Sequence, residues 1–83
     1  MDVNFEEFLK NLILPLVEKP EDVVVKELET SSDDTVALQV LVASDDLGRV
    51  IGKNGRIINA LRTILYSCGA RYGKRIEVSV DSF

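Results

Sequence analysis

The sequence predicts a single α+β domain in which a three-stranded mixed sheet carries all three helices on one face. Apolar residues recur with the helical period in two stretches and alternate with polar residues in two others. Two predicted helices lie between the last two predicted strands, and a crossover of this kind joins parallel strands. The chain has 83 residues, 46% of them hydrophobic, which is enough for one small core. The expected order over residues 1–83 is therefore α-β-β-α-α-β.

The first expected element is an amphipathic helix from residue 3 to about residue 17. Its apolar stripe has helical spacing and consists of Phe5, Phe8, Leu9, Leu12 and Leu16. Asp2 is the expected N-cap, because its carboxylate can accept from the unpaired N–H groups of the first turn. Pro15 lacks an N–H and crowds the preceding turn, so we expect a kink rather than a straight helix. Residues 19–22 then form a loop.

Three β-rich segments predict strands at residues 23–29, 35–43 and 75–81. The polar residues 30–34 indicate a hairpin connection between the first two strands. Alternation along the second strand directs four side chains toward the core, namely Val36, Leu38, Val40 and Val42. The last strand is expected to direct Ile76, Val78 and Val80 inward.

Two helices are expected between the second and third strands. Residues 44–46 supply a cap and first-turn acids for a short helix that runs through Ile51. A longer helix follows a glycine turn and extends to about Cys68, and Gly69 is a suitable stop signal for it. Residues 70–74 then form a basic loop.

Composition argues against several kinds of function. The chain has no histidine, which is the commonest acid–base group near neutral pH and the commonest metal ligand. The lone cysteine, Cys68, can form neither an internal disulfide nor a structural zinc site, and it fits a small buried side chain. The carboxylate pairs Asp33-Asp34 and Asp45-Asp46 lie at a turn and at a helix start, where capping explains them. We therefore expect no enzyme activity, no metal and no cofactor.

The chain has no feature of a membrane or secreted protein. No apolar stretch approaches the roughly 18 to 20 residues that a membrane span needs. The N-terminus is acidic, with Asp2, Glu6 and Glu7, and so differs from the cationic start of a signal peptide. These absences, with the single cysteine, predict a cytoplasmic protein.

Charge is divided unevenly along the chain, whose net charge is −4. Residues 1–46 hold three basic and twelve acidic side chains, a net charge of −9, whereas residues 47–83 hold seven basic and two acidic side chains, a net charge of +5. This asymmetry predicts one basic working surface on an acidic body. Scattered solvated charges would produce the same count.

The segment GRVIGKNGRI places three of the five glycines and three basic side chains between two helices. Gly52 and Gly55 permit unusual backbone angles and leave no Cβ to hold a ligand away. The second helix begins near Gly55 with unpaired N–H groups and the positive end of its dipole exposed. With Lys53 at the tip and Arg49 and Arg56 one turn to either side, the segment predicts a phosphate site. On spacing alone, an ordinary helical turn with glycine at both ends explains the same residues.

The same segment resembles the signature of the KH domain, V-I-G-x-x-G-x-x-I between two helices, which runs here from Val50 to Ile58. The element order is similar to the type II KH arrangement, in which a helix and a strand precede a β-α-α-β core. Within that group the chain resembles the small single-domain bacterial KH proteins of the KhpA (YlqC) type. The segments that carry this similarity are LVEKPEDV, DLGRVIGK and ALRT, which begin at residues 16, 46 and 60. The resemblance covers nearly the whole chain.

The resemblance implies a single-stranded RNA-binding protein of low sequence specificity, whose GxxG loop clamps the backbone of about four nucleotides. The loop residues that would hold phosphates are Gly52, Lys53, Asn54 and Gly55. The flanking cations would be Arg49, Arg56, Lys74 and Arg75. An apolar groove for the bases would have a floor of Val50, Ile51 and Ile58, with Ile76 and Val78 on its far side. For Ile58, Ile76 and Val78 a place in the core is at least as good an explanation. Tyr66 and Tyr72 could stack on bases, but ordinary packing is the favoured explanation for both.

The resemblance also implies partners. Relatives in this group form homodimers, and they pair with a larger KH-containing protein of the KhpB type in post-transcriptional control. We therefore expect an RNA chaperone or post-transcriptional regulator that forms a homodimer or such a heterodimer. The alternative is an assembly module whose KH surface is chiefly a protein interface.

Overall fold

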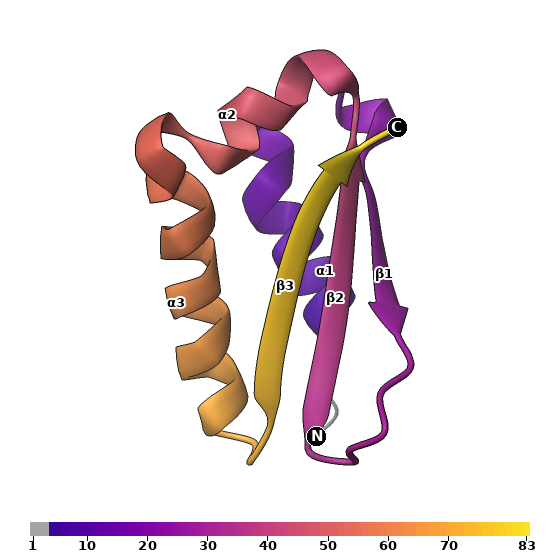
Figure 1. Ribbon diagram of the computed structural model, residues 1–83, viewed down its shortest axis with the longest axis vertical. Coiled ribbons are helices and arrows are strands. Elements are labelled where there is room, and N and C mark those ends of the chain that lie inside the picture. The colour runs from indigo at the N-terminus through magenta and orange to yellow at the C-terminus, as the bar shows by residue number, and fades with distance from the viewer. Residues whose placement is uncertain (1–3) are drawn as a thin grey trace.

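The computed structural model describes residues 4–83 and has the predicted order of elements (Figure 1). The helices are α1 (Phe5–Ile13), α2 (Leu47–Ile51) and α3 (Arg56–Ala70), and the strands are β1 (Val24–Leu28), β2 (Thr35–Val42) and β3 (Arg75–Ser82). Short 3-10 turns occupy residues 14–16, 20–22, 44–46 and 53–55. The predicted α+β class, with three helices and a three-stranded mixed sheet, is confirmed.

The sheet has the strand order β1-β2-β3. β1 runs antiparallel to β2, with Val25 opposite Val40, and β3 runs parallel to β2, with Val78 opposite Leu38. The two-helix crossover between β2 and β3 accounts for the parallel pairing. Because β3 is last in the strand order, it is an edge strand, and its free edge lies beside α3 (Figure 1).

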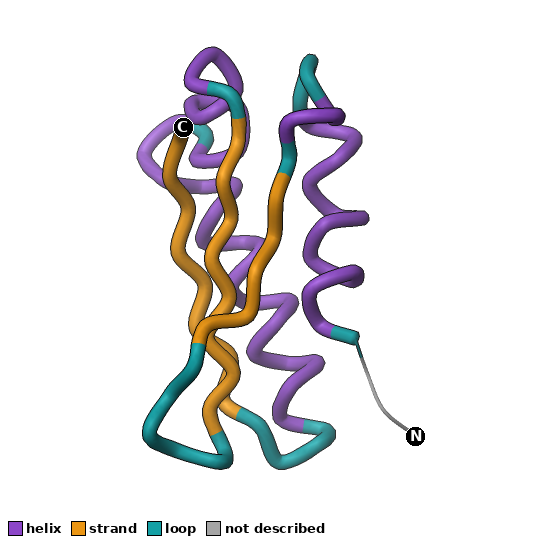
Figure 2. The backbone as a smooth tube through the Cα atoms, turned by 90° about the vertical axis from the view of Figure 1, so that its right-hand side faces the viewer, coloured by secondary structure: helices purple, strands orange, loops and turns teal. Residues whose placement is uncertain are grey.

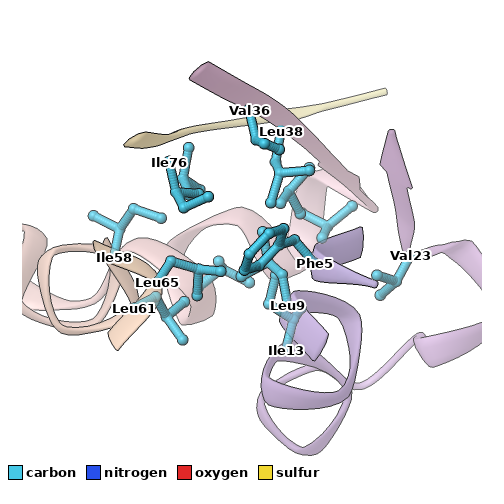
Figure 3. Close-up of a cluster of buried hydrophobic side chains, with 14 residues drawn as sticks. Phe5, Leu9, Ile13, Val23, Val36, Leu38, Ile58, Leu61, Leu65 and Ile76 are labelled. Atoms are coloured by element: carbon cyan, nitrogen blue, oxygen red, sulfur yellow. The ribbon is translucent and has the colours of Figure 1, made fainter. Parts of the chain in front are cut away.

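One contiguous core joins the helices to the sheet. The inward residues of β2 are all buried, as the alternation predicted: Val36, Leu38, Val40 and Val42. Leu9 and Ile13 of α1 and Leu61 and Leu65 of α3 pack against this face (Figure 3). The backbone view shows α1 and α3 covering the same side of the strands (Figure 2). Val50 of α2 is fully buried in the same cluster, so all three helices share this core.

The start and end of α1 differ in detail from the prediction. Asn4 caps the helix, because its Oδ1 accepts the Glu7 N–H at 3.0 Å. The predicted cap, Asp2, lies outside the described residues. The helix ends at Ile13, and Pro15 lies in the following 3-10 turn, which tolerates its missing N–H. The expected kink is therefore a change from α-helical to 3-10 geometry.

Gly69 does not stop α3, so this prediction is wrong. The helix continues to Ala70, and a Cβ built on Gly69 would lie only 2.5 Å from Ile76 Cγ1. The missing side chain allows β3 to pack closely against the end of α3. The chain reverses instead at Gly73, which has a φ of +68°.

Candidate nucleic-acid interface

The glycine turn connects α2 to α3 at one end of the molecule (Figure 1). Gly52 (φ 77°, ψ 170°) follows α2, and its N–H donates to the Gly48 carbonyl at 2.8 Å. Asn54 (φ 58°, ψ 24°) and Gly55 (φ 76°, ψ 17°) both have left-handed backbones. The Gly55 N–H donates to the Gly52 carbonyl at 3.1 Å and closes the turn. Three of four consecutive residues thus have a positive φ.

Backbone geometry accounts for the residue types in this turn. The φ and ψ of Gly52 lie in a region that is essentially restricted to glycine. A Cβ on Gly52 would also lie 2.7 Å from Ile57 Cγ1 and 2.9 Å from the Ile57 backbone nitrogen. A Cβ on Gly55 would make only an ordinary contact, at 3.5 Å from Asn59 Nδ2, so the positive φ alone favours glycine there. Asparagine at position 54 is among the few residues with a side chain that tolerate the left-handed region.

The turn presents backbone donors beside two exposed cations. Lys53 and Asn54 stand at the start of the turn, so no carbonyl of the turn precedes them at the spacing that could accept from their N–H groups. α3 is 15 residues long, and the positive end of its dipole faces the turn. The side chains of Lys53 and Arg56 are exposed, and neither forms a salt bridge within residues 4–83. This combination of amides and unpaired cations suits an oxyanion such as a phosphate.

Arg49, which was predicted as a third cation of the turn, is engaged with groups of the protein itself. Its Nη2 donates to Glu18 Oε1 at 2.6 Å. Its Nη1 donates to the Asp45 carbonyl at 2.8 Å and lies 3.3 Å from Asp46 Oδ1. The positive charge of Arg49 is therefore compensated by two carboxylates before any ligand arrives.

Asp46 is the one buried charged side chain in residues 4–83, and it does not cap α2 as the sequence predicted. Its two carboxylate oxygens accept the backbone N–H groups of Glu18 and Lys19, each at 3.0 Å. The Glu18 N–H, supported by the Lys19 N–H and by Arg49, holds the pKa of Asp46 below its ordinary value, although burial acts in the opposite direction. Asp46 therefore fastens the segment that precedes β1 to the start of α2.

Most of the apolar side chains predicted for a base-binding groove lie in the core. Val50 and Ile76 are fully buried, and Ile58 exposes 5% and Val78 exposes 7% of its surface. Their burial fits the core explanation that the sequence left open for Ile58, Ile76 and Val78. Ile51 is half-buried at the end of α2, so it is the member of this group that offers apolar surface beside the turn.

Lys74 and Arg75 lie at the opposite end of α3 from the turn (Figure 1). An α-helix rises about 1.5 Å per residue, so the 15 residues of α3 separate its two ends by about 22 Å. Lys74 Nζ donates to the Asp33 carbonyl at 2.8 Å, whereas the Arg75 side chain is exposed. The structure thus brings Lys53 and Arg56 together at the turn, and places the other two predicted cations at a separate location.

Arg62, which the sequence reasoning did not single out, spans the seam between α3 and the free edge of β3. Its Nε and Nη2 donate to the Val78 carbonyl at 3.2 and 3.1 Å, and its Nη1 donates to Asn59 Oδ1 at 3.3 Å. Gly55, Asn59 and Arg62 are spaced by four and three residues, so they share one face of α3. This polar stripe, which starts at the turn, was the signal in the sequence that could have identified Arg62.

The remaining candidate side chains have different surroundings. Tyr66 and Tyr72 are both about half exposed, and the Tyr72 ring also packs edge-on against Phe5, with centroids 6.2 Å apart. Cys68 is partly buried. Residues 4–83 contain no group of three or more side chains that could hold a metal ion, and no helix described there has the length and apolarity to cross a membrane.

Comparison with known proteins gives consistent matches. A family model described as "KhpA/KhpB, KH domain" matches residues 6–80. The chain is 41% identical over 75 residues to the RNA-binding protein KhpA of Listeria monocytogenes, and this alignment covers 90% of this chain and 96% of the relative. It is 34% identical over 79 residues to the RNA-binding protein KhpA of Bacillus subtilis, and this alignment covers 95% of each chain.

A similar fold occurs in solved structures. A crystal structure of Aquifex aeolicus Era superposes with a TM-score of 0.67 at 19% sequence identity. The match covers 100% of this chain and 33% of the Era chain, so this chain spans about a third of Era's length. At this identity the similarity concerns the fold alone.

Proposed function

Since the chain belongs to the KhpA/KhpB family of KH domains, we propose that it binds single-stranded RNA with low sequence specificity and holds the RNA backbone at the turn from Gly52 to Gly55. Its relatives in Listeria monocytogenes and Bacillus subtilis are named RNA-binding proteins. The observation that carries the proposal is the turn, where left-handed backbone, free N–H groups and two exposed cations meet at the start of α3. An RNA phosphate is an anion that all three features can accommodate.

The proposed contact depends on the RNA backbone. The N–H groups of Lys53 and Asn54 donate to phosphate oxygens, while the side chains of Lys53 and Arg56 supply charge. Contacts to phosphates carry no sequence information directly, so the specificity is low. This behaviour fits an RNA chaperone or a post-transcriptional regulator that acts in the cytoplasm. All of these contacts are hydrogen bonds and charge interactions with phosphates, so the proposed role is binding and not catalysis.

A second candidate function is protein assembly through the open face of the sheet. Because α1, α2 and α3 pack on one face, the outward side chains of β1 and β2 point away from the helices, and Val24, Ala37 and Leu41 are half-buried there. These outward residues include the cross-strand pairs Val24–Leu41 and Leu28–Ala37, and Leu28 is 43% exposed. A second copy of the chain, or a larger KhpB-type protein, would bury this surface, and RNA contact would then be incidental.

Reversing the charge at the tip of the turn tests the RNA proposal. The double variant Lys53→Asp, Asn54→Asp keeps both glycines and points two carboxylates at the proposed phosphate. RNA affinity, measured by fluorescence anisotropy, is expected to fall sharply, while the melting temperature stays nearly unchanged, because acids are favourable near a helix N-terminus. The wild type should show a log–log salt slope of about −1.4 to −2.8, which corresponds to two to four phosphate contacts on a single strand.

The chain offers a matched control for this variant. Lys10 and Asn11 form the same dipeptide on the exposed side of α1, so Lys10→Asp, Asn11→Asp makes the same change in net charge outside the turn. This control should retain most of the RNA affinity. Unchanged RNA binding by the folded turn variant would refute the proposal. Loss of self-association in sedimentation, with RNA binding intact, would make the turn a protein interface, whereas assembly through the open face of the sheet should be unaffected by the turn variant.

A further inference from the structure

A hollow lies at the end of α3 that is remote from the glycine turn. Its volume is about 370 Å³, within the size range of small-molecule sites. It is lined by Tyr66 of α3, by Lys74 and Arg75 at the start of β3, and by Ile76. The lining residues among 4–83 therefore comprise one aromatic ring, two cations and one aliphatic side chain, with no acidic group.

The aromatic ring and the cations of this hollow are available to a ligand. Tyr66 is 50% exposed and lines the hollow, whereas Tyr72, which is 47% exposed and packs edge-on against Phe5, does not line it. Lys74 Nζ donates to the neutral Asp33 carbonyl and forms no salt bridge with a carboxylate of residues 4–83. Arg75 forms no salt bridge within residues 4–83. An accessible aromatic face with adjacent cations is the combination that binds single-stranded nucleic acid, because a base stacks on the ring and a cation attracts the phosphate.

A continuous face of α3 joins the hollow to the turn. Gly55, Asn59, Arg62 and Tyr66 follow one another at intervals of four, three and four residues, so they lie along the same side of the helix. Tyr66 is eleven residues beyond Gly55, a rise of about 16 Å. An RNA strand that leaves the turn along this face passes the Arg62 bridge to β3 before it reaches Tyr66.

We propose that this hollow is a second nucleotide subsite, in which Tyr66 stacks on one base and Arg75, with Lys74, attracts the neighbouring phosphate of an RNA whose other part is held at the turn. The inference rests on the proposed RNA-binding function and adds to it a longer footprint than the glycine turn requires. It also assigns the charges of Lys74 and Arg75 to a phosphate other than the one at the turn.

The test compares RNA oligonucleotides of two lengths. Labelled oligouridines of about four nucleotides, the length that a GxxG loop clamps, and of about eight are titrated with the wild type and with Tyr66→Ala. Tyr66→Ala should weaken binding of the longer RNA about tenfold and leave the shorter RNA unaffected, because one stacking contact is lost. Tyr66→Phe keeps the ring and should retain wild-type affinity. Arg75→Gln should make the salt slope for the longer RNA less steep by about 0.7.

Controls and outcomes separate this inference from the proposed function. Ile64→Ala removes another exposed apolar side chain of α3, 42% exposed, which does not line the hollow, and it should have no effect on RNA binding. An equal loss of affinity for both lengths, or no loss for either, would overturn the subsite while the wild type still binds RNA. A wild type that binds neither RNA would refute the proposed function itself. Loss of self-association by Tyr66→Ala with RNA affinity intact would make the hollow a protein contact.

Discussion

Replacing Gly52 by alanine tests whether the backbone shape of the turn is required. A residue with a Cβ at the φ of 77° and ψ of 170° observed for Gly52 costs about 1–3 kcal/mol. The new Cβ would also lie 2.7 Å from Ile57 Cγ1 and 2.9 Å from the Ile57 nitrogen. The side chain can turn away at about 0.5–1.5 kcal/mol, but the backbone nitrogen belongs to α3 and can move only with the helix. We expect the free energy of unfolding to fall by about 2–4 kcal/mol.

Gly55→Ala is the matched substitution, because it changes φ strain without the close approach. Gly55 has nearly the same φ, 76°, but its Cβ would lie 3.5 Å from the nearest heavy atom beyond its chain neighbours, Asn59 Nδ2. A left-handed residue other than glycine costs about 1–2 kcal/mol, so Gly55→Ala should be the milder of the two. Urea denaturation gives both values, and in a domain of this size each kcal/mol lowers the melting temperature by about 4–8 °C.

RNA binding supplies the second readout for these variants. At a temperature where both proteins are folded, Gly52→Ala should lose more RNA affinity than Gly55→Ala, because the shift in the Lys53 and Asn54 amides is larger. Equal destabilisation by the two substitutions would contradict the importance of the Ile57 contact. Full RNA affinity in folded Gly52→Ala would show that the turn backbone does not make the contact.

Further substitutions test other parts of the structure. Gly69→Ala should lower the free energy of unfolding by about 1–3 kcal/mol, because the new methyl group overpacks the contact with β3. Gly48→Ala, with nothing within 4 Å of its Cβ, should raise the free energy of unfolding by about 0.5–1 kcal/mol, and equal shifts of the two variants in thermal melts would contradict this. Asp46→Asn should flatten the acid side of the stability–pH curve. Because the pKa of Asp46 is lowered in the folded state, its contribution to the free energy of unfolding is complete above its ordinary pKa of 3.8 and is lost as the pH falls through the folded-state pKa. If urea titrations gave the same stability–pH curve for Asp46→Asn and the wild type, this role would be excluded. Arg49→Gln should reduce stability, whereas Arg56→Gln should leave the melt unchanged and make the RNA salt slope less steep by about 0.7; the reverse pattern would show that the two arginines were assigned incorrectly.

Local patterns along the chain were sufficient to predict the fold class and the location of the candidate turn. Alternation from Val36 to Val42 identifies the buried strand, because successive side chains of a strand point to opposite faces. The two-helix crossover requires β2 and β3 to be parallel. Gly52 and Gly55 mark the turn, since only positions with positive φ or a close approach need glycine. Each of these inferences depends on residues that are near one another in the sequence.

Packing between distant segments set the features that these patterns could not reveal. Arg49 and Glu18 are 31 residues apart, so no local rule distinguishes this paired arginine from Arg56, which forms no salt bridge within residues 4–83. Gly69 has the sequence context of a helix stop, but its role depends on Ile76, which reaches it only because β3 folds back along α3. The separation of Arg75 from the turn follows from the length of α3 in the folded chain. Local free-energy preferences select helix, strand and turn, whereas the partners of a charge and the space around a glycine exist only after the core has formed.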